Sequence, residues 1–123
     1  MFNIDFYEDY KGCSDVRDFL DSLFEIAKEN KDARIQFKQM VRNIELLRNH
    51  GYNLPNEIIK HVEKEIWELR PGKNRVFYFL YEENTYVLLH HFRKKTRKTP
   101  RREIDRAFLE MEDYIRQRRV KDT

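Results

Sequence analysis

Three short segments in the second half of the chain follow a period of two, and turns of only a few residues separate them. The segments are Glu65–Arg70, Arg75–Tyr81 and Thr85–Phe92, and the turns read PGKN and EENT. A period of two is typical of β-strands, and proline, glycine and asparagine favour tight reversals of the chain. Because such short turns join only antiparallel neighbours, the pattern predicts an antiparallel meander at the centre of the fold.

The remaining segments predict one more strand and three helices around this meander. Phe2–Tyr7 alternates in the same way, which indicates a first strand. Ser14 is placed to cap a helix, and Gly51 is placed to end the second of two amphipathic helices that should pair antiparallel. After the meander, Thr99 and Pro100 have the residue types of an N-cap and a first helical position. The resulting order, β-α-α-β-β-β-α, indicates the α+β class.

The length and composition of the chain limit its class. With 123 residues and 40% hydrophobic side chains, we expect a single domain over residues 1–123 with one packed core. The one cysteine, Cys13, excludes an internal disulfide, and no signal peptide or apolar run of about 18 residues occurs. These features predict a cytoplasmic protein that does not enter a membrane. Because neither a Cys or His cluster nor a glycine-rich phosphate loop occurs, we expect no metal and no cofactor.

Positive charge is concentrated just after the last predicted strand. The net charge is only +3, yet the run FRKKTRKTPRR (Phe92–Arg102) holds seven basic residues and no acid. Any one of these side chains alone is typical of a solvated surface, but a cluster can attract a polyanion. We interpret it as an RNA-binding surface, with Phe92, Tyr78 or Tyr81 available to stack on bases. The residues predicted to contact RNA are Lys73, Arg93, Arg97, Lys98, Arg101 and Arg102.

The first hairpin of the meander adds a pair of arginines. Alternation places Trp67 and Leu69 on one face of the first meander strand and Glu68 and Arg70 on the other. Arg70 and Arg75 flank the PGKN turn as near neighbours. Two guanidinium groups side by side repel each other unless an anion lies between them, and their planar forks suit phosphate oxygens. The pair therefore predicts a phosphate site.

Two histidines are adjacent in the last predicted strand. Because successive side chains of a strand point to opposite faces, His90 and His91 cannot act as a pair on one face. A lone histidine on an apolar face is more often a core residue than a catalyst. By parity, His91 shares a face with Arg93, so His91 is the histidine that could titrate near neutral pH beside the basic surface.

Two motifs are specific enough to resemble a known family. EIWELRPGKNRVFYF and LLHHFRKKTRKTPRREIDRA, which cover about Ile66–Ala107, resemble the HigB-type toxins of the RelE/ParE superfamily, in particular a phage-derived branch. The resemblance implies a small RelE-like fold in which helices pack on one face of an antiparallel sheet. It implies a type II toxin-antitoxin toxin that acts as a ribosome-dependent mRNA endoribonuclease, or mRNA interferase. The implied partners are the ribosome with its mRNA and a cognate HigA-like helix-turn-helix antitoxin.

The resemblance also implies roles for single residues. Arg75 matches the arginine that stabilises the phosphate under attack. Arg70, Lys94 and Lys95 match basic residues that hold RNA and offset charge in the transition state. The sequence departs from the better-known RelE members at Glu68, where they place a lysine that takes part in proton transfer.

RNA cleavage without a metal requires the 2′-hydroxyl to lose a proton as it attacks the neighbouring phosphate. Arginine keeps its proton at neutral pH, so Arg75 is assigned to electrostatic stabilisation. Lysine, with an ordinary pKa of about 10.4, is a poor base. Glu68 and His91 are the two candidates for the base, and the sequence does not decide between them.

Two other functions stay open at this stage. A protein of this fold can inhibit a protein target, as ParE-type relatives act on DNA gyrase, although phosphate-binding arginines would then have no purpose. A non-catalytic RNA-binding module would protect RNA without cutting it.

Overall fold

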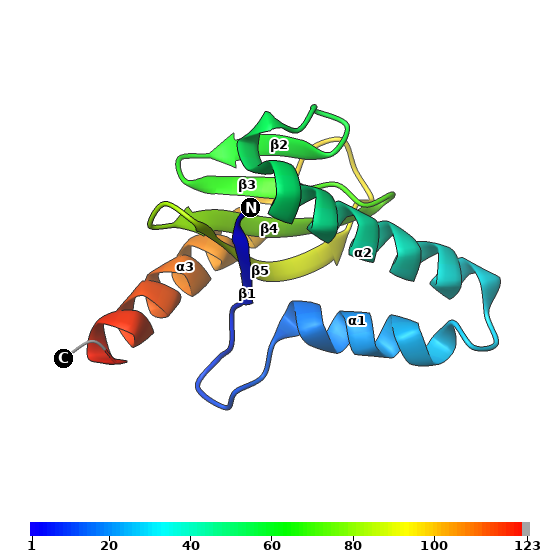
Figure 1. Cartoon of the computed structure of the whole chain (residues 1–123), viewed down its shortest axis with the longest axis horizontal. Coiled ribbons are helices and arrows are strands. Elements are labelled where there is room, and N and C mark those ends of the chain that lie inside the picture. The colour runs from blue at the N-terminus through cyan, green and yellow to red at the C-terminus, as the bar shows by residue number, and fades with distance from the viewer. Residues whose placement is uncertain (122–123) are drawn as a thin grey trace.

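The computed structural model describes residues 1–121, and it describes side chains as far as Arg119. This part of the chain forms a five-stranded mixed sheet with helices on both faces (Figure 1). The elements in chain order are β1 (Asn3–Phe6), α1 (Asp15–Ile26), α2 (Lys31–His50), the short 3-10 helix η1 (Gly51–Asn53), β2 (Ile59–Glu63), β3 (Ile66–Leu69), β4 (Asn74–Tyr81), β5 (Thr85–Arg93) and α3 (Arg101–Lys121). None of the helices within these residues is long and apolar enough to cross a membrane.

The sheet has the strand order β1-β5-β4-β3-β2. The predicted meander is confirmed, because β3, β4 and β5 pair antiparallel through the two short turns. The expectation of an all-antiparallel sheet is wrong at one edge, where β1 lies parallel to β5 and Asn3 pairs with Thr85. Two helices separate β1 from the other strands in sequence, so no tight turn determines the direction of β1. The α+β class is confirmed.

β2 is an edge strand that the sequence pattern did not predict. It pairs antiparallel with β3, and the two strands are joined by Lys64 and Glu65. Lys64 adopts a φ of 48°, a conformation for which tight turns normally use glycine or asparagine. Because this turn contains neither residue, the sequence shows no hairpin signal there, and the expected meander begins only at Glu65.

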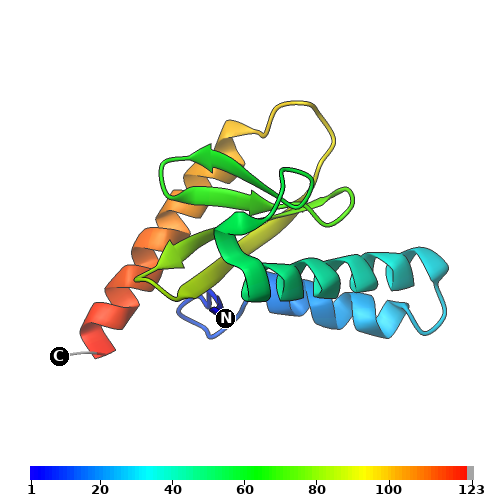
Figure 2. The same ribbon diagram turned by 45° about the horizontal axis from the view of Figure 1, so that its top comes forward.

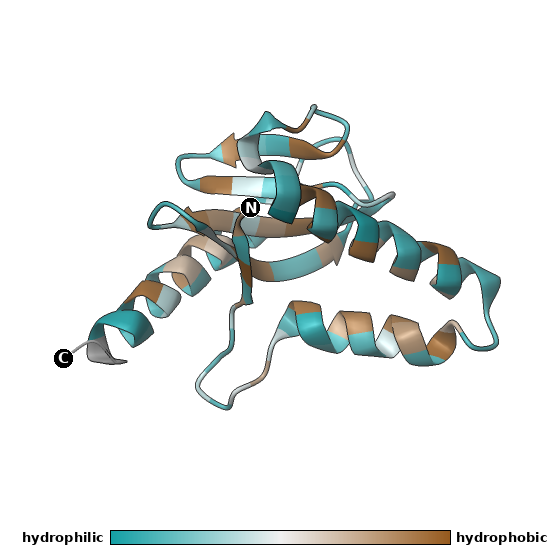
Figure 3. Cartoon of the chain, viewed as in Figure 1, coloured by the Kyte–Doolittle hydropathy of each residue, from teal (hydrophilic) through white to brown (hydrophobic). Residues whose placement is uncertain are grey.

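Helices cover both faces of the sheet, so the expectation of a single covered face is wrong. The α1–α2 pair packs on one face and α3 on the other (Figure 1, Figure 2). The reason lies in β4, whose first six residues are all buried, so that both of its faces need cover. Figure 3 shows β4 as a largely hydrophobic strand. The core under α1 and α2 includes Val16, Met40, Leu47, Leu69, Val76 and Leu88, and the core under α3 includes Ile66, Phe77, Val87, Leu89, Ala107 and Met111.

A bulge in β5 decides which way its two histidines point. The pairing of β4 with β5 shifts register after Phe77, and Leu89 is left without a partner. Phe77 pairs with His90, so His90 lies on the face that α3 covers. His91, the next residue, points to the face that α1 covers. The predicted opposite orientation of the two histidines is confirmed.

The predicted helix boundaries are close to those observed. Ser14 is the N-cap of α1, as predicted. Gly51 ends α2 with a φ of 55°, and a Cβ atom at this position would lie 2.4 Å from the ring of Phe2, so a larger residue does not fit. α3 begins at Arg101, one residue later than predicted, and the carbonyl of Pro100 accepts its first hydrogen bonds.

Candidate functional site

The two arginines of the β3–β4 hairpin share one buried carboxylate. Oε2 of Glu68 lies 3.2 Å from Nε of Arg75 and 3.4 Å from Nε of Arg70. The Glu68 side chain is 5% exposed. Glu68 stands opposite Phe77 in the pairing of β3 with β4, so its side chain lies on the face of the sheet that α3 covers. The structure therefore brings the predicted arginine pair together, with one carboxylate in contact with both guanidinium groups.

Backbone carbonyls hold the guanidinium of Arg75 in place. Its Nη1 donates to the carbonyl oxygens of Gly72 and Asn74, both at 2.8 Å. Its buried Nε–H makes no hydrogen bond within residues 1–121, so the contact with Glu68 is one of charge alone. Burial lowers the pKa of Arg75 from its usual value, the Glu68 carboxylate opposes this shift and Arg70 adds to it. A fixed guanidinium of this kind suits electrostatic stabilisation of an anion.

Two segments far apart in sequence meet beside Arg75. The backbone N–H of Lys94 donates to the carbonyl of Lys73 at 2.9 Å, which places the segment after β5 against the β3–β4 turn. Between them is a depression of about 390 Å³, here called the basic groove, lined by Gly72, Lys73, Arg75, Lys94, Lys95, Thr96 and Arg97. Five of these seven residues are cationic and none of them is acidic. Because like charges repel across the groove, this arrangement favours a bound anion.

A second depression, here called the loop pocket, shares Lys94, Lys95 and Thr96 with the basic groove. It has a volume of about 470 Å³ and is lined by Phe92, Arg93, Lys94, Lys95, Thr96, Lys98, Thr99, Pro100, Arg102 and Glu103. The hydroxyl of Thr96 donates to the carbonyl of Lys98 at 2.7 Å, which holds the loop in a tight bend. The basic groove and the loop pocket together contain every residue predicted to contact RNA except Arg101.

Arg101 lies outside both depressions. Its guanidinium donates to both carboxylate oxygens of Glu63, at 2.7 and 3.0 Å, and to Asp105 at 3.0 Å. The hydrogen bond to Glu63, and next the one to Asp105, raise the pKa of Arg101 above its usual value. Arg101 thus ties the start of α3 to the edge strand β2, and these surroundings do not support the prediction that it contacts RNA.

His91 lies on the opposite face of the sheet from Glu68. Its Nδ1 is 2.6 Å from Oδ1 of Asp15, and its ring stacks on Phe19 with the centroids 3.8 Å apart. Burial raises the pKa of Asp15, but hydrogen bonds from the side chain and backbone of His91 outweigh that effect and lower the pKa to about 2. His91, one of the two candidates for the base, thus lies on the other face of the sheet from Arg75, where it connects β5 to α1.

Sequence reasoning missed a cluster of titratable side chains next to the loop pocket, formed by one histidine and two glutamates. His90 is fully buried, with Nδ1 at 2.5 Å from Oε1 of Glu110 and Nε2 at 3.3 Å from Oε1 of Glu103. Glu103 also lines the loop pocket. The two glutamates stand seven residues apart in the sequence, about two helical turns, so both lie on the helix face that meets β5. The spacing of these two glutamates beside the apolar residues of α3 was the sequence signal that could have predicted this cluster.

The aromatic residues proposed for base stacking are distributed over the molecule. Phe92 lines the loop pocket. Tyr78 lies on the other face of the sheet, and Tyr81 packs on Tyr114 of α3 with the ring centroids 5.2 Å apart. Within residues 1–121, no group of three or more His, Cys, Asp or Glu side chains is placed to hold a metal ion.

Residues 25–112 match the sequence profile of the family described as Phage derived protein Gp49-like. This region is more than two thirds of the chain, and it contains the arginine pair, the basic groove and the loop pocket. The chain belongs to the Gp49-like family. β1, all of α1 except its last two residues, and the last part of α3 lie outside the region that the family shares.

Two solved structures are similar to this chain at low sequence identity. One is described as a YoeB-YefM complex from Staphylococcus aureus, with 12% identity and a TM-score of 0.48 over 78% of this chain and 99% of that chain. The other is described as a heterotetrameric complex of YoeB-YefM toxin-antitoxin from Staphylococcus aureus, with 11% identity, the same TM-score of 0.48 and the same coverage of 78% and 99%. No curated protein matches the chain.

Proposed function

We propose that this protein is the toxin of a type II toxin-antitoxin system and that it cleaves mRNA on the ribosome. One observation carries the proposal: Lys73 and Arg75 from one hairpin converge with Lys94, Lys95 and Arg97 from a distant segment on the basic groove. A phosphodiester backbone is the ligand that such a surface suits. The resemblance of the sequence to HigB-type toxins supports the same proposal.

Arg75 is the residue proposed to stabilise the transition state. In the cleavage step, the 2′-oxygen bonds to phosphorus and loses its proton, while the bond from phosphorus to the 5′-oxygen breaks and that oxygen gains a proton. Negative charge grows on the other phosphate oxygens. Two carbonyls hold Nη1 of Arg75, and Nη2 has no acceptor within residues 1–121, so Nη2 is available for a phosphate oxygen.

Glu68 is the residue proposed to accept the proton of the 2′-hydroxyl, because its carboxylate contacts Arg75. In the free protein this carboxylate is almost completely buried and held by two positive charges. A phosphate that binds both arginines competes with Glu68 for them and releases the carboxylate for proton transfer. Such a site needs a substrate that is already oriented, which is the reason we propose dependence on the ribosome.

The other basic residues are proposed to seat the protein on RNA. Lys94 and Lys95 line both depressions, and they are proposed to contact a phosphate in the basic groove. Arg70 contacts the same Glu68 carboxylate as Arg75, so it is proposed to offset charge in the transition state together with Arg75. The proposed contacts to mRNA and ribosomal RNA are Lys73, Arg93, Arg97, Lys98 and Arg102. The proposed partners are the ribosome with its mRNA and a HigA-like helix-turn-helix antitoxin. Because ribosomes are cytoplasmic, the proposed location is the cytoplasm. The proposed reaction uses no cofactor.

Incubation of the purified protein with translating ribosomes, followed by mapping of mRNA ends, tests the proposal. We expect new internal cuts with wild-type protein and a loss of about 100-fold or more in the cleavage rate with Arg75→Ala, whose circular dichroism spectrum should match wild type. Arg116→Ala is the matched control, because Arg116 is an exposed arginine of α3 that pairs with Asp113. It should cut like wild type.

Three other results would contradict the proposal in different ways. Cutting by Arg75→Ala at the wild-type rate would remove Arg75 from the mechanism. Protection of mRNA without cutting would indicate an RNA-binding module. Intact mRNA together with inhibited supercoiling by DNA gyrase would indicate a toxin with a protein target.

A further inference from the structure

The loop pocket contains one carboxylate among several cations. Of the ten described residues that line it, Glu103 is the only acid. The basic ones are Arg93, Lys94, Lys95, Lys98 and Arg102. Glu103 stands in the first turn of α3, at the end of the loop that leads there from β5 (Figure 2). A ligand that suits this lining carries negative charge overall and also presents hydrogen-bond donors to one carboxylate.

The carboxylate of Glu103 lacks a hydrogen-bond donor. Its side chain is only 17% exposed, yet no described residue donates a hydrogen bond to it. Nε2 of His90 lies 3.3 Å from its Oε1, but this buried nitrogen makes no hydrogen bond within the described residues. Glu110, on the other side of the same imidazole, is bonded to both His90 and Arg106. Because a mostly buried carboxylate without donors is costly, a ligand that supplies N–H groups to Glu103 is favoured.

The loop pocket adjoins the basic groove, so one nucleotide can reach both. Lys94, Lys95 and Thr96 line both depressions. Phe92, which is half-buried and lines the loop pocket, stands opposite Arg75 in the pairing of β4 with β5. Residues paired in this way have Cα atoms about 5 Å apart. A phosphate in the basic groove therefore leaves its base within reach of the loop pocket.

The hydrogen-bonding edges of the four RNA bases decide which base suits Glu103. The Watson–Crick edge of guanine carries two adjacent donors, N1–H and the 2-amino group, which match the two oxygens of a carboxylate. Adenine and cytosine place an acceptor nitrogen beside their amino group, and uracil flanks its single N–H with two carbonyls, so these acceptors repel the carboxylate. An arginine or lysine of a protein ligand also has donors, but the cations of the pocket repel it.

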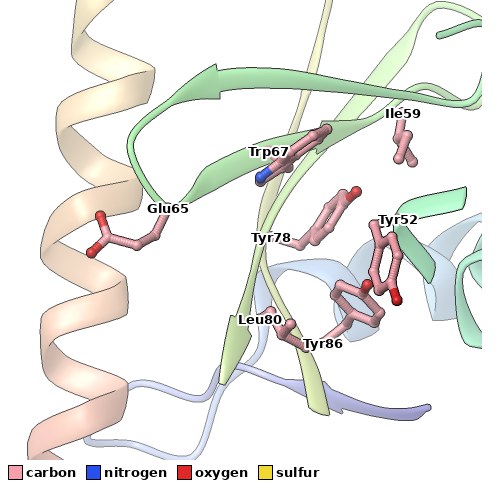
Figure 4. Close-up of a pocket in the computed structure, with 7 residues that line it drawn as sticks. All are labelled: Tyr52, Ile59, Glu65, Trp67, Tyr78, Leu80 and Tyr86. Carbon is pink, nitrogen blue, oxygen red and sulfur yellow. The ribbon is translucent and has the colours of Figure 1, made fainter. Parts of the chain in front are cut away.

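A third pocket, on the face of the sheet that α1 and α2 cover, lacks these features. Its lining includes Trp67, Tyr78 and Tyr86 (Figure 4). None of the seven described residues that line it is a cation, and the carboxylate of Glu65 points away from it toward α3. Because this pocket offers no positive charge to a phosphate, the loop pocket is the better site for an RNA base.

We propose that the loop pocket binds a guanine base of the substrate RNA, with Phe92 stacked on the base and Glu103 accepting hydrogen bonds from N1–H and the 2-amino group. That the ligand is RNA rests on the proposed function. The surrounding cations hold the phosphates on either side of this nucleotide. Because every base can stack on an aromatic ring, Phe92 contributes affinity, whereas Glu103 selects the base.

Binding of short RNAs to the full chain tests this inference without the ribosome. Oligouridines that differ only in one central nucleotide are compared by fluorescence anisotropy at low salt. Central guanosine should bind about tenfold more tightly than adenosine, cytidine or uridine. Inosine keeps N1–H but lacks the 2-amino group, so it should bind about threefold more weakly than guanosine. The analogue 7-deazaguanosine keeps both donors and should bind like guanosine.

Two variants and one matched control assign the preference to Glu103. Glu103→Gln should abolish the preference for guanosine, whereas its affinity for oligouridine should rise about twofold, because a negative charge leaves the cationic pocket. Glu103→Asp keeps a negative charge in the first turn of α3 but shortens the side chain, and it should lose most of the preference. Asp105→Asn removes an exposed carboxylate two residues further along α3, which pairs with Arg101, and should keep the preference.

Several results would overturn the inference. They are equal affinity for all four central bases, equal affinity for inosine and guanosine, a preference that survives in both Glu103 variants, a preference that Asp105→Asn also abolishes, or no binding of any oligonucleotide. An equal loss of affinity for every RNA in Glu103→Gln would show that Glu103 has a structural role only. Failure of the proposed function is a different result, namely a chain that prefers guanosine in these titrations but cuts no mRNA on ribosomes.

Discussion

Replacement of Glu68 by glutamine should destabilise the fold, because it removes the negative charge that contacts both Arg70 and Arg75. At an effective dielectric constant of about 20, each contact, at 3.2 and 3.4 Å, corresponds to about 5 kcal/mol of Coulomb attraction, and burial of the carboxylate offsets most of it. Loss of one partner from a buried ion pair costs about 3–5 kcal/mol. Because the Arg70 side chain is 23% exposed, water screens part of this loss. We therefore expect a decrease of about 2–3 kcal/mol in the free energy of unfolding.

Urea unfolding at low ionic strength measures this loss without the screening that guanidinium chloride would add. In thermal unfolding the same loss lowers Tm by about 8–12 °C for a chain of this size. Glu57→Gln is the control, because Glu57 is exposed and its replacement should change stability by less than about 0.5 kcal/mol. Added sulfate should stabilise Glu68→Gln more than wild type, since in the variant no carboxylate competes for the two arginines.

Two outcomes would refute this reasoning. Equal stability of Glu68→Gln and wild type at low ionic strength would show that the arginines do not depend on the charge of Glu68. A loss that sulfate does not reduce would show that the arginine pair does not bind an oxyanion, and it would weaken the proposed role of Arg75 in binding phosphate.

Two further predictions concern stability. Burial raises the pKa of Asp15, but hydrogen bonds from His91 outweigh it and lower this pKa to about 2 in the folded protein. The ionised Asp15 therefore stabilises the fold above pH ~4, the range of its usual pKa, and this contribution is lost as the pH falls through 2. After allowance for partial exposure this contribution amounts to about 1–2 kcal/mol. Urea unfolding between pH 6 and 2 should show that the free energy of unfolding falls less steeply with pH in Asp15→Asn than in wild type. An equally steep fall in both proteins would contradict the assignment. Gly51→Ala should cost about 2–4 kcal/mol, because the new Cβ meets the Phe2 ring at 2.4 Å in a backbone with φ of 55°. Gly12→Ala, with φ of 79° and no atom within 4 Å, should cost about 1 kcal/mol, and equal losses in thermal unfolding would rule out crowding at Gly51.

Much of the fold could be predicted because its signals are local. The PGKN and EENT turns and the Ser14 cap each depend on a few consecutive residues, and each stands where the sequence indicates. β2 could not be predicted in this way. Its turn uses Lys64 at positive φ, and the strand is stabilised by pairing with β3 rather than by its own pattern.

The candidate site was only partly predictable. Arg70 and Arg75 flank one turn, so their proximity follows from the hairpin alone. The approach of Lys94 to Lys73 depends on how β5 pairs with β4, and the contact of His90 with Glu103 depends on how α3 docks. Neither contact can be predicted from the sequence of a single segment.

The pairing register of β5 shows most clearly where prediction from the sequence ends. Counted back from the EENT turn without a bulge, His91 would stand opposite Arg75 and share its face. The extra residue, Leu89, moves Phe92 into that position and turns His91 toward α1. A one-residue shift of this kind reverses the face of a side chain, and nothing in the local sequence reports it.

By itself, the sequence determined the strands of the meander, the helix ends and the excess of positive charge after β5, because these depend on neighbours along the chain. Only the tertiary structure decided that helices cover both faces, that β1 runs parallel to β5, and that the arginine pair and His91 lie on opposite faces of one sheet. The reason is physical: which side of a strand meets which helix is set by packing and pairing between distant segments, and their free energies exist only once the chain has folded.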